Sequence, residues 1–366
     1  MERAVDVAIV GGGIAGAAAA LSLAQRGRSI VIITPPGHGD FRVVESLSPA
    51  ANALLDELGL AERFAAGPHR EAFVTFAAWG SPLLAQRHAM VHADGPGYVL
   101  DRPAFERMLL AAVRETGIET VAGTLSDSLR MEDGWSLVLH DGHRLAARFV
   151  LDCSGRAAVF ARCRGRLRRA DRLVAAYACL DPLDDEVEPT PATLIESVAD
   201  GWWYAALLPD RRLSLAFFSD ADQLVRGLTR DAAVWRRMVL ETAFIRRWLR
   251  TAGYVPDAPP RLASAGTTWL EPAAGSDWAA AGDSAAAFDP LSSHGLTSAL
   301  WAGRRAALGA LAALNDEPAE LARYAATMAG AVRDFLVQRQ VVYSHERRFH
   351  GHLFWDRRRA PTTPTA

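Results

Sequence analysis

A glycine-rich turn near the start of the chain restricts the possible folds more than any other feature. Residues Gly11–Gly16 read GGGIAG and fit the pattern G-x-G-x-x-G. An apolar run at 5–10 predicts a buried strand before the turn, and an alanine-rich stretch at 17–26 predicts a helix after it. A β-branched run at 30–33 predicts a second strand, so the whole unit is typical of a dinucleotide-binding fold.

Each glycine of this turn has a physical task in such a fold. Gly11 allows the tight turn, Gly13 lets the backbone approach a pyrophosphate, and Gly16 lets the helix pack closely on the strand. The N-terminus of the helix offers free N–H groups and a positive dipole end to the phosphates. We therefore predict cofactor contacts by the three glycines and by Ile14 and Ala15.

The end of the second strand departs from the dinucleotide pattern. An acidic residue usually stands there and holds the ribose hydroxyls, whereas this chain has Thr34 followed by two prolines. A threonine hydroxyl makes one such hydrogen bond and cannot make the two of a carboxylate. Asp40 or Glu45 can replace the missing acid, and the sequence leaves that choice open.

Two later segments favour FAD over a nicotinamide cofactor. Gly282-Asp283 ends a predicted strand, and in flavoproteins such a pair binds the ribityl and phosphate region. Residues 289–295 open a long predicted helix whose positive end would stabilise an anionic reduced flavin. The cofactor contacts predicted from these segments are Asp283, Pro290, Ser293, Gly295 and Leu296.

Charged and polar residues between apolar runs form a further group of cofactor candidates. Arg42, Glu45 and Ser46 follow the second strand, and Arg102 directly precedes the helix predicted at 103–116. These residues can form surface ion pairs, which is the commoner case, or they can contact the FAD phosphates and ribityl chain.

Composition excludes several classes of function. The 366 residues carry a net charge of −2, which provides no field to attract nucleic acid or a membrane surface. No apolar stretch is long enough to span a membrane, no secretory signal is visible, and the three cysteines form neither a metal pattern nor a disulfide framework. We therefore expect a cytoplasmic protein without a metal site. The chain has no lysine, so Schiff-base and P-loop chemistry are impossible.

The predicted elements interleave along the chain and indicate an α/β fold with a discontinuous FAD-binding domain. We expect a doubly wound sheet of the glutathione-reductase-like type, an inserted β-rich substrate domain and a helical C-terminal region. The predicted boundaries are 1–68, 98–172 and 262–315 for the FAD-binding domain, 69–97 and 173–261 for the substrate domain, and 316–366 for the C-terminal helices and tail. Within the substrate domain, 232–251 is predicted to be helical.

Together these motifs resemble the tryptophan-halogenase-like branch of the FAD-dependent monooxygenases with the p-hydroxybenzoate-hydroxylase fold. The resemblance covers nearly the whole chain. Its segments are Gly11–Gly16, Glu45–Pro49, Trp79–Ser81, Leu100–Arg102, Asp152–Arg156, Gly201–Tyr204 with Leu208-Pro209, Gly282–Ala285, Asp289–Gly295 and Phe354–Arg358.

The resemblance implies bound FAD, reduced by NAD(P)H or by a separate flavin reductase, and a flavin C4a-hydroperoxide formed from dioxygen. Family halogenases use a lysine beside the substrate and a Trp-x-Trp-x-Ile-Pro segment. This chain has no lysine and reads WWYAALLP at 202–209, so we expect hydroxylation of an electron-rich aromatic substrate and not halogenation. The subgroup that matures tryptophylquinone-containing oxidases is the nearest, which implies a tryptophan side chain in a partner protein as substrate.

Candidate catalytic and substrate residues carry two interpretations each. His294, in the loop before the long helix, can be an acid or base, or a loop histidine bonded to backbone. Glu196 can be an active-site base or a strand-end carboxylate. Trp202, Trp203 and Tyr204 can wall an aromatic pocket, or some of them can be core residues.

The C-terminus and the reaction class also leave alternatives open. Arginines between 347 and 359, interleaved with aromatic residues, can dock a protein partner or can cap the fold. A flavin-dependent reductase of the geranylgeranyl-reductase type, or a non-catalytic flavin-binding chaperone for a partner enzyme, is the alternative to a monooxygenase.

Overall fold

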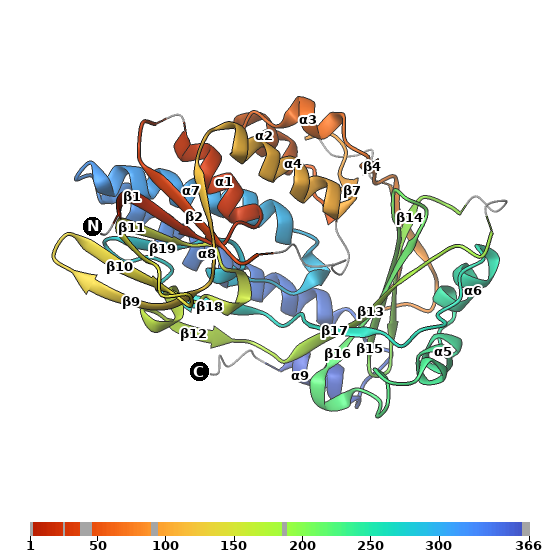
Figure 1. Ribbon diagram of the computed structural model, residues 1–366. Helices are drawn as coiled ribbons and strands as arrows, with labels where there is room; N and C mark the ends of the chain where they lie inside the picture. The colour runs from red at the N-terminus through yellow and green to blue at the C-terminus, as the bar shows by residue number, and fades with distance from the viewer. Residues whose placement is uncertain (1–2, 25, 37–45, 89–93, 185–188, 361–366) are drawn as a thin grey trace.

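Two seven-stranded sheets, set side by side, form the framework of the protein (Figure 1). The computed structural model describes residues 3–24, 26–36, 46–88, 94–184 and 189–360. Helices cover the first sheet, which contains the N-terminal strand, and the second sheet stands to the right of it in Figure 1. The mixed α/β architecture with an FAD-binding sheet confirms the predicted fold class.

The first sheet contains the strand–turn–helix–strand unit that the glycine-rich turn predicts. Its parallel strands have the order β8-β2-β1-β11-β19, and β10 and β9 form a hairpin beside the start of β11. The strand bounds are β1 (Arg3–Val10), β2 (Ile30–Thr34), β8 (Glu119–Ala122), β9 (Leu125–Met131), β10 (Gly134–Leu139), β11 (Arg144–Asp152) and β19 (Trp278–Ala280).

Helices from distant parts of the sequence pack together on this sheet. Helix α1 (Ile14–Ala24) contacts α7 (Gly295–Leu314) and α4 (Arg102–Glu115), while α2 (Ala51–Glu57) lies against α7 and α3 (Ala61–Ala65) follows α2. Gly303 of α7 lies so close to α1 that a Cβ there would come within 2.1 Å of the carbonyl oxygen of Ala15. The approach of the two helices therefore depends on a glycine.

The second sheet is antiparallel except for one parallel pair, and it separates two apolar clusters. Its order is β17-β13-β16-β15-β14-β5-β6, and β5 and β14 are the parallel pair. The bounds are β5 (Val74–Ala78), β6 (Ala85–His88), β13 (Leu173–Leu180), β14 (Ala192–Val198), β15 (Gly201–Leu207), β16 (Leu213–Asp220) and β17 (Arg261–Ser264). The domain boundary drawn at 262 falls inside β17, and the division into domains stays a prediction.

Two three-stranded sheets complete the β structure. One has the order β12-β18-β20, with β12 (Arg166–Arg169), β18 (Thr268–Glu271) and β20 (Ala286–Ala287). The other has the order β3-β7-β4, with β3 (Ser46–Leu47), β7 (Tyr98–Val99) and β4 (Arg70–Glu71).

The predicted helical stretch at 232–251 is two helices, α5 (Ala232–Leu240) and α6 (Phe244–Thr251), which cover the outer face of the second sheet (Figure 1). The carboxylate of Glu196 on β14 accepts hydrogen bonds from the backbone N–H groups of Ala243, Phe244 and Ile245, at 2.6–2.9 Å. It thereby satisfies the free donors at the start of α6. Glu196 is buried and does not line the cavity described below, which favours a structural role over that of an active-site base.

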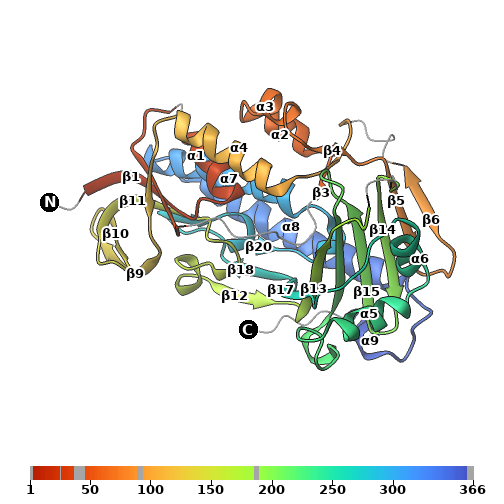
Figure 2. The ribbon, with the colours of Figure 1, turned by 45° about the vertical axis from the view of Figure 1, so that its right-hand side comes forward.

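The C-terminal region forms α8 (Ala319–Ser344) and α9 (Leu353–Arg359), and α8 runs behind the second sheet (Figure 2). Its basic and aromatic residues pack or form ion pairs within the fold. Phe354 and Trp355 are fully buried. Ion pairs join Arg348 to Glu346, Arg357 to Asp220 and Asp222, Arg358 to Asp220, and Arg359 to Asp356. This arrangement favours the capping interpretation over partner docking.

The described residues hold neither a candidate membrane-spanning helix nor a candidate metal site. No helix in these ranges combines the length and the apolar character that crossing a bilayer requires. The same ranges contain no group of three or more His, Cys, Asp or Glu side chains that could hold a metal ion.

Candidate functional site

A cavity of about 800 Å³ lies between the glycine-rich turn of the first sheet and the inner face of the second sheet. It is lined at one end by the turn and the start of α1, and at the other end by β13, β15, β16 and β17. The loop before α7 closes the space between these ends. The cavity therefore joins the predicted cofactor site to the predicted substrate domain.

The glycine-rich turn forms an open cradle at the edge of this cavity. Gly11, Gly13, Ile14 and Ala15 line it. A Cβ on Gly13 would meet no atom within 4 Å, whereas a Cβ on Gly16 would lie 1.9 Å from the carbonyl oxygen of Gly11. Gly16 thus serves the packing of helix on turn, and Gly13 leaves space for a ligand. This geometry fits a pyrophosphate at the N-terminus of α1.

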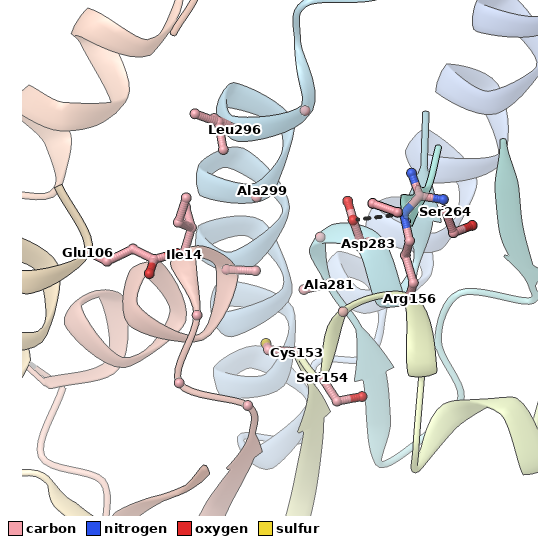
Figure 3. A pocket seen from close by; sticks show the side chains of 18 of the residues that line it. Ile14, Glu106, Cys153, Ser154, Arg156, Ser264, Ala281, Asp283, Leu296 and Ala299 are labelled. Carbon is pink, nitrogen blue, oxygen red and sulfur yellow. Dashed lines mark ion pairs between the residues drawn. The ribbon is translucent and has the colours of Figure 1, made fainter. Parts of the chain in front are cut away.

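The loop before α7 brings four predicted cofactor residues to the same cavity. Pro290, Ser293, Gly295 and Leu296 all line it, and Ser293 adopts a left-handed conformation with a φ of 53°. Leu296 lies on the first turn of α7 (Figure 3). Because the positive end of this 20-residue helix is directed to the cavity, it favours negative charge there.

A buried carboxylate connects two of the segments that line the cavity. Asp152, at the end of β11, is fully buried and accepts hydrogen bonds from the backbone N–H groups of Ser154, Phe160 and Ala161. The Ser284 hydroxyl donates to the same carboxylate at 3.2 Å. This carboxylate joins the loop after β11 to the Gly282-Asp283 segment. Cys153 also lines the cavity, and burial raises its pKa so that the thiol stays protonated.

Arg156 lines the cavity but is not among the contact residues predicted from the sequence. Its Nε lies 3.5 Å from a carboxylate oxygen of Asp283, and its Nη1 donates to the carbonyl of Gly266 at 2.5 Å. Figure 3 shows the Arg156–Asp283 pair beside Ser264. A guanidinium here can contact a phosphate. Its signal was present in the sequence, because Arg156 ends the Asp152–Arg156 segment on which the resemblance rests.

The remaining predicted cofactor residues divide into two groups. Thr34, Ser46, Arg102 and Asp283 line the cavity, and the Nε of Arg102 pairs with Glu106 one helical turn away at 2.8 Å. Arg42 and Glu45, and the alternative ribose acid Asp40, lie outside the described residues. The binding roles of all these residues stay predictions.

An aromatic wall on the second sheet closes the far end of the cavity. It consists of Tyr177, Tyr204 and Phe218. Trp202 does not line the cavity; its ring stacks on that of the cavity residue Phe218 with centroids 4.0 Å apart. Trp203 points to the opposite face of the sheet and packs on Trp235. Of these three residues only Tyr204 lines the cavity, and its role toward a substrate stays a prediction. Trp203 lies on the opposite face because neighbours on a strand alternate between faces.

His294 precedes the first residue of α7, but its side chain is exposed and does not line the cavity. Its Nδ1 contacts the backbone carbonyl of Ser292. This is the alternative in which His294 is a loop residue bonded to backbone.

Replacing His294 with alanine is therefore expected to leave flavin content unchanged and product formation within about twofold, as is usual for an exposed side chain. Flavin absorbance and steady-state product formation measure this. The matched control is His143→Ala, which removes an exposed histidine on the far side of the first sheet that pairs with Asp141. A loss of turnover confined to the His294 variant would restore the acid–base interpretation.

Comparison with known proteins places this geometry in a family. The chain matches the tryptophan halogenase family over residues 80–366 and an FAD binding domain over residues 6–39. LodB of Marinomonas mediterranea, an FAD-dependent oxidoreductase by name, is 28% identical over 367 residues, which cover 97% of each chain.

Solved structures show the same likeness. QhpG, described as a peptidyl tryptophan dihydroxylase essential for tryptophylquinone cofactor biogenesis, is 25% identical with a TM-score of 0.71, covering 98% of this chain and 79% of QhpG. The myxobacterial chondrochloren halogenase CndH shares the fold, with a TM-score of 0.85 at 20% identity over 99% of this chain and 87% of CndH. The match to residues 80–366, the FAD-binding sheet and the open cradle lead to one conclusion: the chain is an FAD-dependent oxidoreductase that belongs to the tryptophan halogenase family.

Proposed function

We propose that this flavoenzyme is a monooxygenase that hydroxylates an electron-rich aromatic ring with dioxygen as co-substrate. The observation that carries the proposal is one continuous cavity, which runs from the glycine-rich cradle to the aromatic wall of Tyr177, Tyr204 and Phe218. Aromatic side chains bind flat apolar rings by stacking and edge contacts. The wall therefore suits an aromatic substrate held next to the cofactor.

Reduced FAD, when bound, supplies the electrons that activate dioxygen. The chain supplies the rest of the site. The cradle from Gly11 to Gly13 would hold the pyrophosphate, and Asp283 and Arg156 offer a carboxylate and a guanidinium to the ribityl and phosphate groups. The N-terminus of α7 favours negative charge. The aromatic wall would orient the substrate and exclude water.

Halogenation is not part of the proposal, although the family takes its name from it. The chain has no lysine, and a lysine is the residue that family halogenases place beside the substrate. Arginine cannot replace it as a nucleophile, because the guanidinium stays protonated. We expect oxygen, and not a halogen, to be transferred.

We further propose that the aromatic ring is a tryptophan side chain within a polypeptide. The likeness to QhpG, which is described as acting on peptidyl tryptophan, supports this substrate class. We expect NAD(P)H or a separate flavin reductase to deliver the electrons. The three cysteines are free in the structure, in keeping with a reducing cytoplasmic setting.

The test is a single-turnover reaction of the FAD-loaded protein under ¹⁸O₂. Reduced protein is mixed with a tryptophan-containing peptide, with free tryptophan or with a phenol, each with and without bromide, and products are analysed by mass spectrometry. We expect one ¹⁸O atom in the aromatic ring and no brominated product, because each reduced flavin supplies the electrons for the transfer of one oxygen atom. Stopped-flow absorbance during the same reaction follows the oxidation of the flavin.

Other outcomes contradict the proposal in distinguishable ways. A brominated product would show that halogenation proceeds without lysine. A product with two added hydrogens and no ¹⁸O would make the protein a reductase. Oxidation of the flavin with every substrate left intact, including an extended series of tryptophan peptides, would favour a non-catalytic role.

A further inference from the structure

A buried polar cluster behind the cavity connects the C-terminal helix α8 to the loop before α7. Asp289, which begins this loop and lines the cavity, is only 1% exposed. One carboxylate oxygen accepts the backbone N–H of Leu291 at 3.0 Å. The other oxygen accepts hydrogen bonds from the Nε of Arg339 at 3.2 Å and from the Tyr343 hydroxyl at 2.8 Å. Both of these side chains belong to α8.

The same cluster also reaches the substrate sheet. The Tyr343 hydroxyl accepts a hydrogen bond from the indole nitrogen of Trp202 at 3.1 Å, and Trp202 stacks on the cavity residue Phe218. Arg339 makes a second ion pair with Asp171, at 2.7 Å, in the connection between β12 and β13. Tyr343 thus lies between the aromatic wall and the loop that leads into α7.

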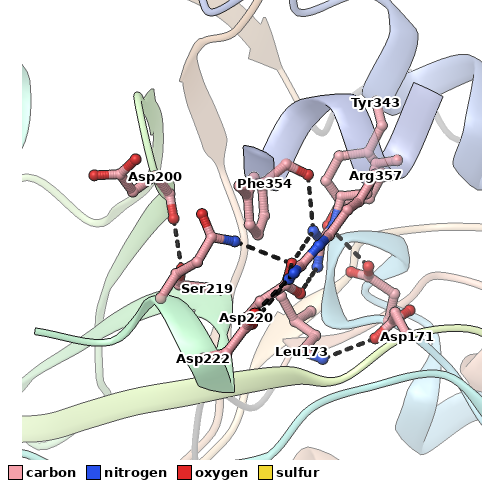
Figure 4. Close-up of polar contacts among 12 residues, drawn as sticks. Asp171, Leu173, Asp200, Ser219, Asp220, Asp222, Tyr343, Phe354 and Arg357 are labelled. Atoms are coloured by element: carbon pink, nitrogen blue, oxygen red, sulfur yellow. Dashed lines mark hydrogen bonds and ion pairs between the residues drawn. The ribbon is translucent and has the colours of Figure 1, made fainter. Parts of the chain in front are cut away.

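The charges in and around the cluster alternate. Asp171 and Asp289 flank Arg339, and Asp220 pairs with Arg357 and with the buried Arg358, whose guanidinium lies 5.3 Å from the centre of the Tyr343 ring. Figure 4 shows Asp171 and Asp220 on either side of this tyrosine. Burial alone would lower the pKa of Arg339, but Asp289, Tyr343 and Asp171 outweigh it, so the guanidinium stays charged.

These groups act at short range on the flavin-facing end of α7. Buried charges are screened much less than exposed ones, so each of them contributes to the electrostatic potential in the cavity. Asp289 opposes the positive end of α7, and Arg339 and the Tyr343 hydroxyl offset that negative charge. Removal of either sign of charge must then change the stability of the more negative, reduced flavin relative to the oxidised one.

We propose that Asp289, Arg339 and Tyr343 are positioning residues that fix the loop before α7 and set the reduction potential of the bound FAD. No proton or electron passes through them. The inference does not depend on hydroxylation, since it concerns the cofactor alone.

The experiment measures the midpoint potential and the FAD dissociation constant of the holoprotein in four variants. Asp289→Asn removes a negative charge but retains an oxygen for the N–H of Leu291, so it is expected to raise the potential. Arg339→Gln removes a positive charge and is expected to lower it. Tyr343→Phe removes a hydroxyl that stabilises Asp289 and is expected to lower it by less. Tyr254→Phe is the control, because its hydroxyl donates to the backbone carbonyl of Arg211 and neither residue lines the cavity.

We expect the two charge variants to shift in opposite directions. The expected shift is about tenfold in the relative affinity for reduced and oxidised FAD, which is roughly 30 mV for a two-electron couple. A purely structural role would weaken FAD binding in all three variants without an opposite sign in the potentials. That result, or unchanged potentials, would overturn the proposal. If Arg339→Gln does not fold, Asp289→Asn and Tyr343→Phe still require shifts of opposite sign.

Discussion

Replacing Gly13 with valine is expected to abolish FAD binding while the protein stays folded. The position at which a Cβ would be added on Gly13 has no protein atom within 4 Å, so the side chain would extend into the cavity and not into the core. It would occupy the space through which the backbone must approach the pyrophosphate. We expect the FAD dissociation constant to rise by about a hundredfold or more, which corresponds to roughly 2.7 kcal/mol.

Flavin content after purification and fluorescence titration with FAD measure this effect, and circular dichroism reports the fold. Gly330→Val is the matched control on α8, where a Cβ would meet only the Arg333 guanidinium at 3.8 Å. Gly16→Val should instead prevent folding, because its Cβ would overlap the Gly11 carbonyl. A Gly13 variant that retains full flavin would show that the pyrophosphate does not lie on this turn.

Replacing Glu346 with glutamine is expected to cost roughly 3 kcal/mol of folding free energy at neutral pH, because a pKa unit corresponds to about 1.4 kcal/mol. Glu346 has no exposed surface. Burial alone would raise its pKa, but hydrogen bonds from Arg348, Ser197 and the N–H of Gly80 lower the pKa to about 2 from 4.5. The carboxylate thereby joins the segment after α8 to β14 and to the loop after β5.

The direction of the pH dependence follows from the sign of that shift. Since the folded protein binds the proton less tightly than the unfolded chain, the stabilisation is complete above about pH 5 and is lost as the pH falls toward 2. Urea denaturation of both proteins at pH 7 and pH 3 should show a difference that shrinks by more than half. Glu317→Gln, at an exposed position, is the control. A difference that stays constant between these pH values would contradict the assignment.

The local part of the cofactor site could be predicted from the sequence because its signals are local. The turn at Gly11–Gly16 and the loop at 290–296 each lie between a strand and a helix, and the segment at Asp283 follows strand β19, so backbone geometry dictates residue type at all three places. Of the described residues selected there as cofactor contacts, all but Gly16 line the cavity, and Gly16 supports the turn from behind; the catalytic candidate His294 in the same loop does not line it.

The predictions for the substrate side were weaker because they depend on tertiary contacts. The period of two along a strand already implies that Trp203 cannot share a face with Trp202 and Tyr204. Nothing in the sequence near Glu196 indicates that it caps a helix about 47 residues later, and only the packing of α6 on β14 reveals this contact. The same holds for Trp202, which stacks on Phe218 of the neighbouring strand and does not line the cavity.

The placement of β19 and α7 has a consequence for biosynthesis. Strand β11 is flanked by β1 on one side and β19 on the other, and Gly303 lies against Ala15, so α1 can meet α4 early but acquires α7 only after nearly 300 further residues have been made. At ribosomal rates of about 5–20 residues per second, synthesis of the residues between α1 and α7 takes roughly a quarter of a minute to one minute. During that interval the face of α1 that packs on α7 is open to chaperones. FAD bound at the proposed site would contact both segments of the cavity, so by mass action its supply would favour completion of the fold over aggregation of the newly made chain.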